Sequence, residues 1–344
     1  MSHSETIDAG IPVIDISDPS PEVAQQVLDA ASTHGFLFIK NDGVTIPPKD
    51  ISDMFELSSK FFRASRKEKE AYTIHSEKAG GKNRGWVSMQ GESLDPENSK
   101  QGDPKEAFNI AEPYPTLQPL PPLLSASIPL ISRFQISCHT LCKNILTLLG
   151  IALNISPTAG GPDWFSIRHD QARGPSGTIF RMLYYPLSST PQDKTSIRAG
   201  AHSDYGSVTL LFRLPGQPGL EVLKSDGTWA AVPVNPNPSQ LHDPPILVNI
   251  GDLLSFWTSG MLKSTVHRVT FSGGEERYSM AYFCHPLDDV ALEGIPSGII
   301  EEYKGGEEIE GQRRKIGLEG ASGKVLTAKE HLDRRLKVTY GLGD

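Results

Sequence analysis

Two histidines and one aspartate in this chain have the residue types and spacing of a metal site. His202 and Asp204 are two residues apart at the expected end of a strand, so their side chains leave the same face. His267 lies in the β-branched stretch 264–269, which also predicts a strand. Two imidazoles and a carboxylate suit iron, zinc, copper or nickel and leave coordination positions open for reactants. These three residues are the candidate catalytic and metal-binding residues, and by themselves they leave the metal undecided.

A possible anion site follows the second histidine. Arg277 and Ser279 come ten and twelve residues after His267. An arginine can bind a carboxylate through two parallel hydrogen bonds, and a serine two residues on along a strand can add a third. Arg277 considered alone could equally form a surface ion pair. Beside a metal triad, it indicates an anionic co-substrate, and the combination favours oxidation by dioxygen at a non-haem ferrous centre.

The composition restricts the partners. A net charge of −8 over 344 residues argues against a broad basic surface for nucleic acid. No run approaches the roughly 20 apolar residues of a membrane span, and the first residues do not resemble a secretory signal. Three cysteines cannot all pair internally and suggest a reducing compartment. We therefore expect a cytoplasmic protein that binds a small molecule and neither nucleic acid nor membrane.

The first half of the chain predicts helices and loops. Ser20 is placed as an N-cap before Pro21, and apolar residues recur at helical spacing behind it. Two further apolar-faced helices are expected over 51–62 and 130–148. The segment 75–127 is rich in Gly, Pro, Ser and charge, which predicts long ordered loops, and such loops are often functional.

The second half predicts a β fold that positions the metal residues. Short β-rich runs alternate with turn residues after about residue 175, and this pattern is typical of a sandwich or barrel such as the jelly roll. The runs are 179–185, 208–212, 220–223, 246–250, 253–257 and 278–283. A last helix is expected to begin at Thr327, because Glu330 completes a capping box with it.

At this point the chain resembles a known family, the 2-oxoglutarate and Fe(II)-dependent dioxygenases of the isopenicillin N synthase-like group. Motifs similar to those of the family occur in family order along nearly the whole chain. They are Ile11-Pro12-Val13-Ile14-Asp15, residues 31–39, residues 103–108, Tyr184-Tyr185-Pro186, His202-Ser203-Asp204, residues 219–222, residues 248–252, residues 264–269 and Arg277-Tyr278-Ser279. The stretch 198–202 is more similar to fungal and bacterial members than to plant ones.

The resemblance implies a mainly β fold, with a double-stranded β-helix (jelly-roll) core and an N-terminal helical region. It divides the chain into an N-terminal helical and loop region over 1–127 and a long helix with its connection over 128–174. The jelly-roll core is expected over 175–300, and a C-terminal helical segment over 301–344.

The resemblance also implies the chemistry. A small organic molecule, of the kind met in secondary metabolism, would be hydroxylated, desaturated or rearranged by dioxygen while 2-oxoglutarate is decarboxylated to succinate and carbon dioxide. The implied iron ligands are His202, Asp204 and His267. The implied 2-oxoglutarate-binding residues are Arg277, Ser279 and Tyr185. Many plant members have an asparagine where this chain has Leu183, which weakens one co-substrate hydrogen bond and leaves the metal ligands untouched.

Two phenylalanines are candidate substrate contacts. Phe283 is similar to a family position that faces the substrate, although core packing explains it equally well. Phe108 carries a weaker version of the same expectation. Two alternative functions stay open: a family oxidase without 2-oxoglutarate, like isopenicillin N synthase or aminocyclopropane-carboxylate oxidase, and a jelly-roll binding protein without turnover.

Overall fold

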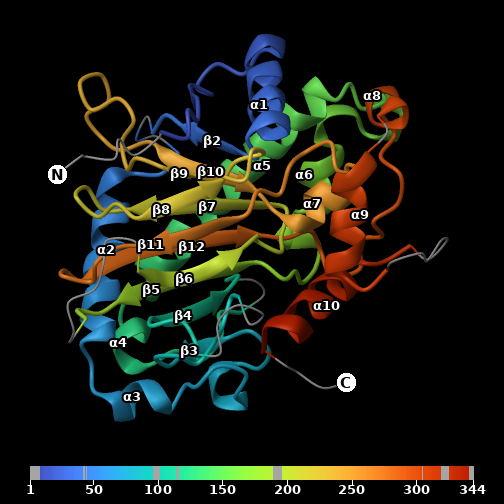
Figure 1. The fold of residues 1–344 in the computed structure, drawn as a ribbon. Helices are drawn as coiled ribbons and strands as arrows, with labels where there is room; N and C mark the ends of the chain where they lie inside the picture. The colour runs from blue at the N-terminus through green and yellow to red at the C-terminus, as the bar shows by residue number, and fades with distance from the viewer. Residues whose placement is uncertain are drawn as a thin grey trace.

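Two β-sheets face each other at the centre of the molecule, and helices cover the outside (Figure 1). The computed structural model describes residues 8–41, 43, 45–95, 101–113, 116–188, 196–303, 305–318 and 325–340, and it describes side chains as far as residue 337. The facing sheets form a double-stranded β-helix, or jelly-roll, core, so the predicted fold class is confirmed.

The larger sheet has eight strands and the smaller sheet has four. In spatial order the larger sheet contains β1 (Val13–Ile14), β2 (Phe36–Ile39), β10 (Ile246–Ile250), β7 (Val208–Arg213), β12 (Arg277–Cys284), β5 (Ile179–Tyr185), β4 (Glu106–Ala111) and β3 (Gly85–Val87). The smaller sheet contains β6 (Ile197–His202), β11 (His267–Thr270), β8 (Leu220–Leu223) and β9 (Trp229–Ala231). Except for the parallel pair β1–β2, neighbouring strands run antiparallel.

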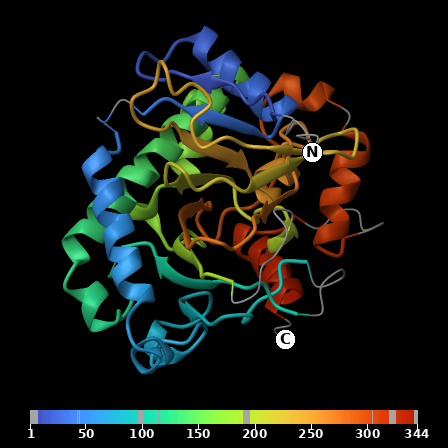
Figure 2. The same cartoon turned by 60° about the vertical axis from the view of Figure 1, so that its left-hand side comes forward.

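The helices frame the sheets. In chain order they are α1 (Pro21–Thr33), α2 (Pro48–Phe62), α3 (Arg66–Glu70), α4 (Pro122–Ser125), α5 (Ile128–Ala152), α6 (Trp164–Arg168), α7 (Asp252–Trp257), α8 (Gly298–Glu302), α9 (Gly306–Lys315) and α10 (Ala328–Tyr340). Helices α2 and α5 pack against the larger sheet, and Figure 2 shows α9 on the opposite side of the molecule. No helix in the described ranges is long and apolar enough to cross a membrane.

Strand alternation divides the interior into two layers. Along β5, Phe180 is fully buried and its ring centroid lies 5.3 Å from that of Phe134 in α5, whereas its neighbour Arg181 lines a cavity between the sheets. Successive residues of a strand point to opposite faces. We call the apolar packing between the larger sheet and α2 and α5 the outer layer, and the space between the two sheets the inner layer.

The local predictions from the sequence have mixed outcomes. The Oγ atom of Ser20 accepts from Val23 N at 3.3 Å and caps α1 as predicted. The capping box is also confirmed, because Thr327 N donates to Glu330 Oε2 at 3.0 Å and Glu330 N donates to Thr327 Oγ1 at 3.2 Å.

Two element assignments were wrong. The run 253–257, predicted as a strand, lies within helix α7, because a short apolar run does not distinguish a buried helix from a strand. The segment 75–127, predicted as loops, supplies β3 and β4 at the edge of the larger sheet. The division of the chain at residues 127, 174 and 300 stays a prediction.

Candidate active site

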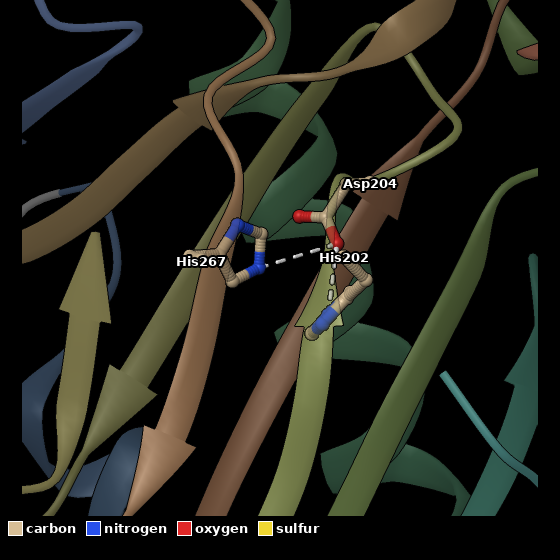
Figure 3. A group of neighbouring side chains, drawn as sticks. All are labelled: His202, Asp204 and His267. Atoms are coloured by element: carbon tan, nitrogen blue, oxygen red, sulfur yellow. Dashed lines mark ion pairs between the residues drawn. The ribbon is translucent and has the colours of Figure 1, made fainter. Parts of the chain in front are cut away.

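The fold brings His202, Asp204 and His267 together in the inner layer (Figure 3). His202 ends β6 and pairs in register with His267, the first residue of β11, while Asp204 lies in the loop after β6. The Oδ1 atom of Asp204 is 3.9 Å from His202 Nε2 and 3.7 Å from His267 Nε2. One ligand atom from each residue lies within 4.8 Å of the others, and no other such group of His, Cys, Asp or Glu occurs among the described residues.

Backbone carbonyls orient both imidazole rings. His202 Nδ1 lies 2.7 Å from the carbonyl oxygen of Gly200, and His267 Nδ1 lies 3.2 Å from that of Thr265. A carbonyl only accepts, so each Nδ1 carries the proton and each Nε2 offers its lone pair. Burial, assisted by the neighbouring His267, lowers the pKa of His202 to about 4 against the opposing effect of Asp204. A neutral imidazole is the form that binds a metal.

Hydrogen bonds hold Asp204 from behind. Asn249 Nδ2 donates to Asp204 Oδ2 at 2.6 Å, which leaves Oδ1 facing the histidines. The main chain of Asp204 accepts from Asp252 N at 2.7 Å. The buried carboxylate of Asp252 in turn accepts from Ser203 Oγ at 3.0 Å and from Ser264 Oγ at 2.7 Å. This supporting shell fixes the orientation of the candidate ligands.

The C-terminal helices complete this support. Lys315 Nζ, at the end of α9, lies 2.7 Å from Asp252 Oδ1, and Arg335 in α10 reaches Asp252 Oδ2 at 3.1 Å. The guanidinium carbon of Arg335 also lies 4.6 Å from the ring centroid of Tyr205, a cavity-lining residue next to Asp204. No local pattern in the sequence indicates that α9 and α10 reach the metal residues, because the contacts span more than sixty residues.

Arg277 carries a buried guanidinium at the wall of a cavity. It is 3% exposed, and within the described ranges no carboxylate pairs with it. Its Nε donates to the carbonyl oxygen of Pro218 at 3.1 Å, and its NH1 group lies 3.4 Å from Ser279 Oγ. The guanidinium carbon is 5.1 Å from the ring centroid of Tyr185, its register partner in β5. Burial lowers the pKa of Arg277, and a buried cation of this kind is stabilised by a bound anion.

A second buried guanidinium strengthens the positive field, and sequence reasoning missed it. Arg213 is the register partner of Ser279 across β7 and β12. It donates to the carbonyl oxygens of Val232 and Pro233 at 2.8 and 2.7 Å. Burial, together with the nearby charge of Arg277, lowers the pKa of Arg213 to about 9. Two cations so close together favour an anionic ligand at this end of the inner layer.

A cavity of about 130 Å³ joins the two sites. Its lining includes His202, Asp204, His267, Arg277, Ser279 and Tyr185. Phe283 and Leu183 also line it. Phe108 does not: its ring packs against Phe61 in the outer layer, with centroids 4.8 Å apart. The expectation of a substrate contact for Phe108 therefore has no support from the fold.

Polar residues that the sequence did not single out also line the cavity. They are Asn83, Glu92, Lys105, Asn109 and Arg181. Asn109 and Arg181 are register partners in β4 and β5. Because the local sequence predicts a loop where β4 lies, it offers no way to place these residues together.

Comparisons with known proteins agree with this geometry. Residues 176–286 match the 2OG-Fe(II) oxygenase superfamily, and residues 11–126 match the N-terminal region described as non-haem dioxygenase in morphine synthesis. The UPF0676 protein C1494.01 of Schizosaccharomyces pombe is 35% identical, over 96% of this chain and 93% of its own. The 2-oxoglutarate-dependent dioxygenase FG08081 of Gibberella zeae is 36% identical, over 49% of this chain and 47% of its own. The crystal structure of a full-length Neurospora crassa protein in complex with alpha-KG superposes with a TM-score of 0.73, at 26% identity over 97% of this chain and 98% of the other.

Proposed function

The chain belongs to the 2OG-Fe(II) oxygenase superfamily, and we propose that His202, Asp204 and His267 hold its iron. It is a 2-oxoglutarate-dependent dioxygenase that oxidises a small molecule. The main support for this proposal is that one possible ligand atom from each of the three residues lies within 4.8 Å of the others, at the wall of the cavity. When bound, the iron supplies the oxidation by dioxygen that is coupled to decarboxylation of 2-oxoglutarate to succinate and carbon dioxide.

We further propose that Arg277, Ser279 and Tyr185 bind 2-oxoglutarate. The guanidinium of Arg277 would take the distal carboxylate, the hydroxyl of Ser279 would donate to the same group, and Tyr185 would hold the guanidinium from the neighbouring strand. Support comes from the burial of Arg277 and from the lack of a carboxylate partner among the described residues. Arg213 would add positive potential without direct contact, because its donors already serve two carbonyls.

The remaining cavity wall would position the substrate. Phe283 lies six residues beyond Arg277 on the same strand face, which is about 20 Å along a strand. The substrate would therefore lie at the end of the cavity away from Arg277. We propose a role in secondary metabolism, as the family resemblance implies. We also propose a cytoplasmic location, in keeping with three free, buried cysteines.

The same Neurospora crassa protein has been crystallised with thymine and with 5-formyluracil. We propose small nitrogen heterocycles of this kind as the first substrates to try on the present protein. A different substrate would leave the iron and 2-oxoglutarate assignments intact, because those assignments rest on other residues.

Two measurements test the proposed function. Adding Fe(II) and 2-oxoglutarate without oxygen should produce a weak visible charge-transfer band, and admitting oxygen should release succinate. A protein that gives neither signal would be the binding protein without turnover. A protein that consumes oxygen and substrate without succinate would be the family oxidase that does not use 2-oxoglutarate. His242→Ala is a suitable control, because that side chain is fully exposed.

A further inference from the structure

The cavity end opposite Arg277 is built from one row of residues across three strands. Asn109 in β4 pairs with Arg181 in β5, and Arg181 pairs with Ala281 in β12. Ala281 is four residues from Arg277, which places this row about 13 Å along the strand from the anion site. The ring of Phe283 lies one row further on. A ligand in this row would therefore be distinct from 2-oxoglutarate bound at Arg277.

The charged side chains of Lys105 and Arg181, which also line the cavity, already form ion pairs. Lys105 Nζ lies 3.0 Å from Glu92 Oε1 and 2.5 Å from Asp103 Oδ2, and all three side chains are almost fully buried. Arg181 forms an ion pair with the same Glu92 carboxylate. Two cations thus face two carboxylates. An anionic substrate would find no uncompensated charge here, in contrast to the surroundings of Arg277.

In this row, the side-chain oxygen of Asn109 is buried and has no hydrogen-bond partner among the described residues. Asn109 is 1% exposed, and its Nδ2 donates to the main-chain oxygen of Asn83 at 3.2 Å and to Asn83 Oδ1 at 3.0 Å. These two acceptors fix which end of the amide is nitrogen. Asn109 Oδ1, on the other end, makes no hydrogen bond within the described ranges. A buried acceptor without a donor is unfavourable, and a ligand with an N–H group would satisfy it.

Asn83 presents the complementary group. Its backbone has a φ of 59°, in the left-handed region, and its main-chain N–H is held by His75 Nδ1 at 3.1 Å. Because its Oδ1 already accepts from Asn109, its Nδ2 is the group that remains to donate. Asn83 and Asn109 both line the cavity. Together they offer one acceptor and one donor, the complement of an amide edge.

We propose that Asn83 and Asn109 form the polar subsite for the substrate, and that this subsite takes a neutral molecule carrying an amide or imide. The ligand N–H donates to Asn109 Oδ1, and the ligand carbonyl accepts from Asn83 Nδ2. Phe283 supplies an apolar surface in the adjoining row. This subsite rests on the proposed function, since it concerns the substrate of that same reaction.

The test measures binding of three probes to the protein loaded with Fe(II) and 2-oxoglutarate without oxygen. Thymine is the neutral imide. Its doubly N-methylated analogue lacks the N–H donors, and the analogue with a carboxylate in place of the methyl group is anionic. We expect thymine to perturb the visible band at lower concentration than either analogue. Equal or tighter binding of the methylated or the anionic probe overturns the subsite, as does the absence of any response to thymine.

Variants of Asn83 and Asn109 test whether these two residues bind thymine. Asn109→Ala should weaken thymine binding at least about tenfold, the loss expected for a buried hydrogen bond. Asn144→Ala, on the exposed face of α5, is the matched control and should not change it. If Asn109→Ala does not fold, Asn83→Gly serves instead, because glycine adopts the left-handed backbone without strain. Unchanged thymine binding in either folded variant overturns the subsite.

The same experiment separates the two proposals. If no visible band forms before any probe is added, the proposed function falls and the subsite falls with it. If the band forms normally and thymine leaves it unchanged, only the subsite falls.

Discussion

The outer and inner layers use the same strands for different purposes. The outward-facing residues of β5, β7 and β12 are apolar or aromatic: Phe180, Met182, Leu210, Phe212, Met280 and Tyr282. Several inward-facing residues of these strands are polar or charged: Arg181, Thr209, Arg213, Arg277 and Ser279. Apolar and aromatic packing dominates the outer layer. Buried polar groups in the inner layer are costly without partners, so their presence indicates ligands that the outer layer does not need.

The largest effect should come from the inner layer. Replacing Asp204 by Ala removes the carboxylate between the two histidines, and we expect iron binding and turnover to fall to background. Iron content and succinate release measure this. The thermal unfolding midpoint should change little by comparison, because Asp204 belongs to no apolar cluster. A variant that retains turnover would show that the triad is not the metal site.

The next prediction compares two phenylalanines on neighbouring strands. Phe180 is fully buried in the outer layer, so Phe180→Ala should reduce the free energy of unfolding by about 3–5 kcal/mol. Phe283 lines the cavity and is only partly buried, so Phe283→Ala should cost clearly less stability. Denaturant unfolding of both variants checks this. Equal losses would mean that the wall at Phe283 is ordinary core.

This contrast also explains what the sequence could reveal. The runs 179–185 and 278–283 predicted β5 and β12 because each is rich in β-forming residues and is bounded by turn residues. His202 with Asp204, and Arg277 with Ser279, were singled out because residues two apart on a strand share a face. His267 was added because its β-branched neighbours predict a strand. Asn83 and Asn109 were missed because they meet only where the short edge strand β3, which begins just after Asn83, pairs with β4. The pairing of distant segments leaves no mark on local periodicity.

The contacts of the C-terminal helices α9 and α10 with Asp252 were not predicted, for a related reason. The capping box at Thr327 predicted where α10 begins, since a cap involves residues three apart. Nothing local indicates that Lys315 and Arg335 pair with Asp252. Such contacts depend on how whole elements pack. Sequence reasoning therefore indicated which residues gather at the cavity, and it did not indicate which elements support them.

A third prediction concerns the anion site. Arg277→Ala removes a charge-assisted contact, so the apparent affinity for 2-oxoglutarate should fall about 10- to 100-fold. Arg277→Lys keeps the charge but loses the paired hydrogen bonds. Its affinity for 2-oxoglutarate should therefore lie between those of the parent protein and Arg277→Ala. Titration of the anaerobic visible band with 2-oxoglutarate measures both. An unchanged affinity in Arg277→Ala would assign Arg277 a purely structural role.

The prediction with the smallest expected effect concerns the pH dependence of stability at a buried histidine, His331, which lies outside both layers. His331 in α10 is fully buried beside Phe256, and neither ring nitrogen has a hydrogen-bond partner within the described ranges. Burial, with smaller contributions from His285, Arg335 and Lys315, lowers its pKa to about 3 against the opposing effect of Asp252.

The sign of the pH dependence follows from this lowered pKa. As the pH falls through about 6.5, the unfolded chain takes up a proton at this histidine and the native protein does not. Stability present above that pH is therefore lost on acidification, with a limiting slope of about 1.4 kcal/mol per pH unit.

His331→Phe removes the proton acceptor and keeps an aromatic ring against Phe256. Between pH 7 and about 5, above most carboxylate titrations, the variant should lose less free energy of unfolding than the parent. Parallel losses would show that His331 takes up its proton over the same pH range in the native protein as in the unfolded chain, so that burial does not keep this imidazole neutral.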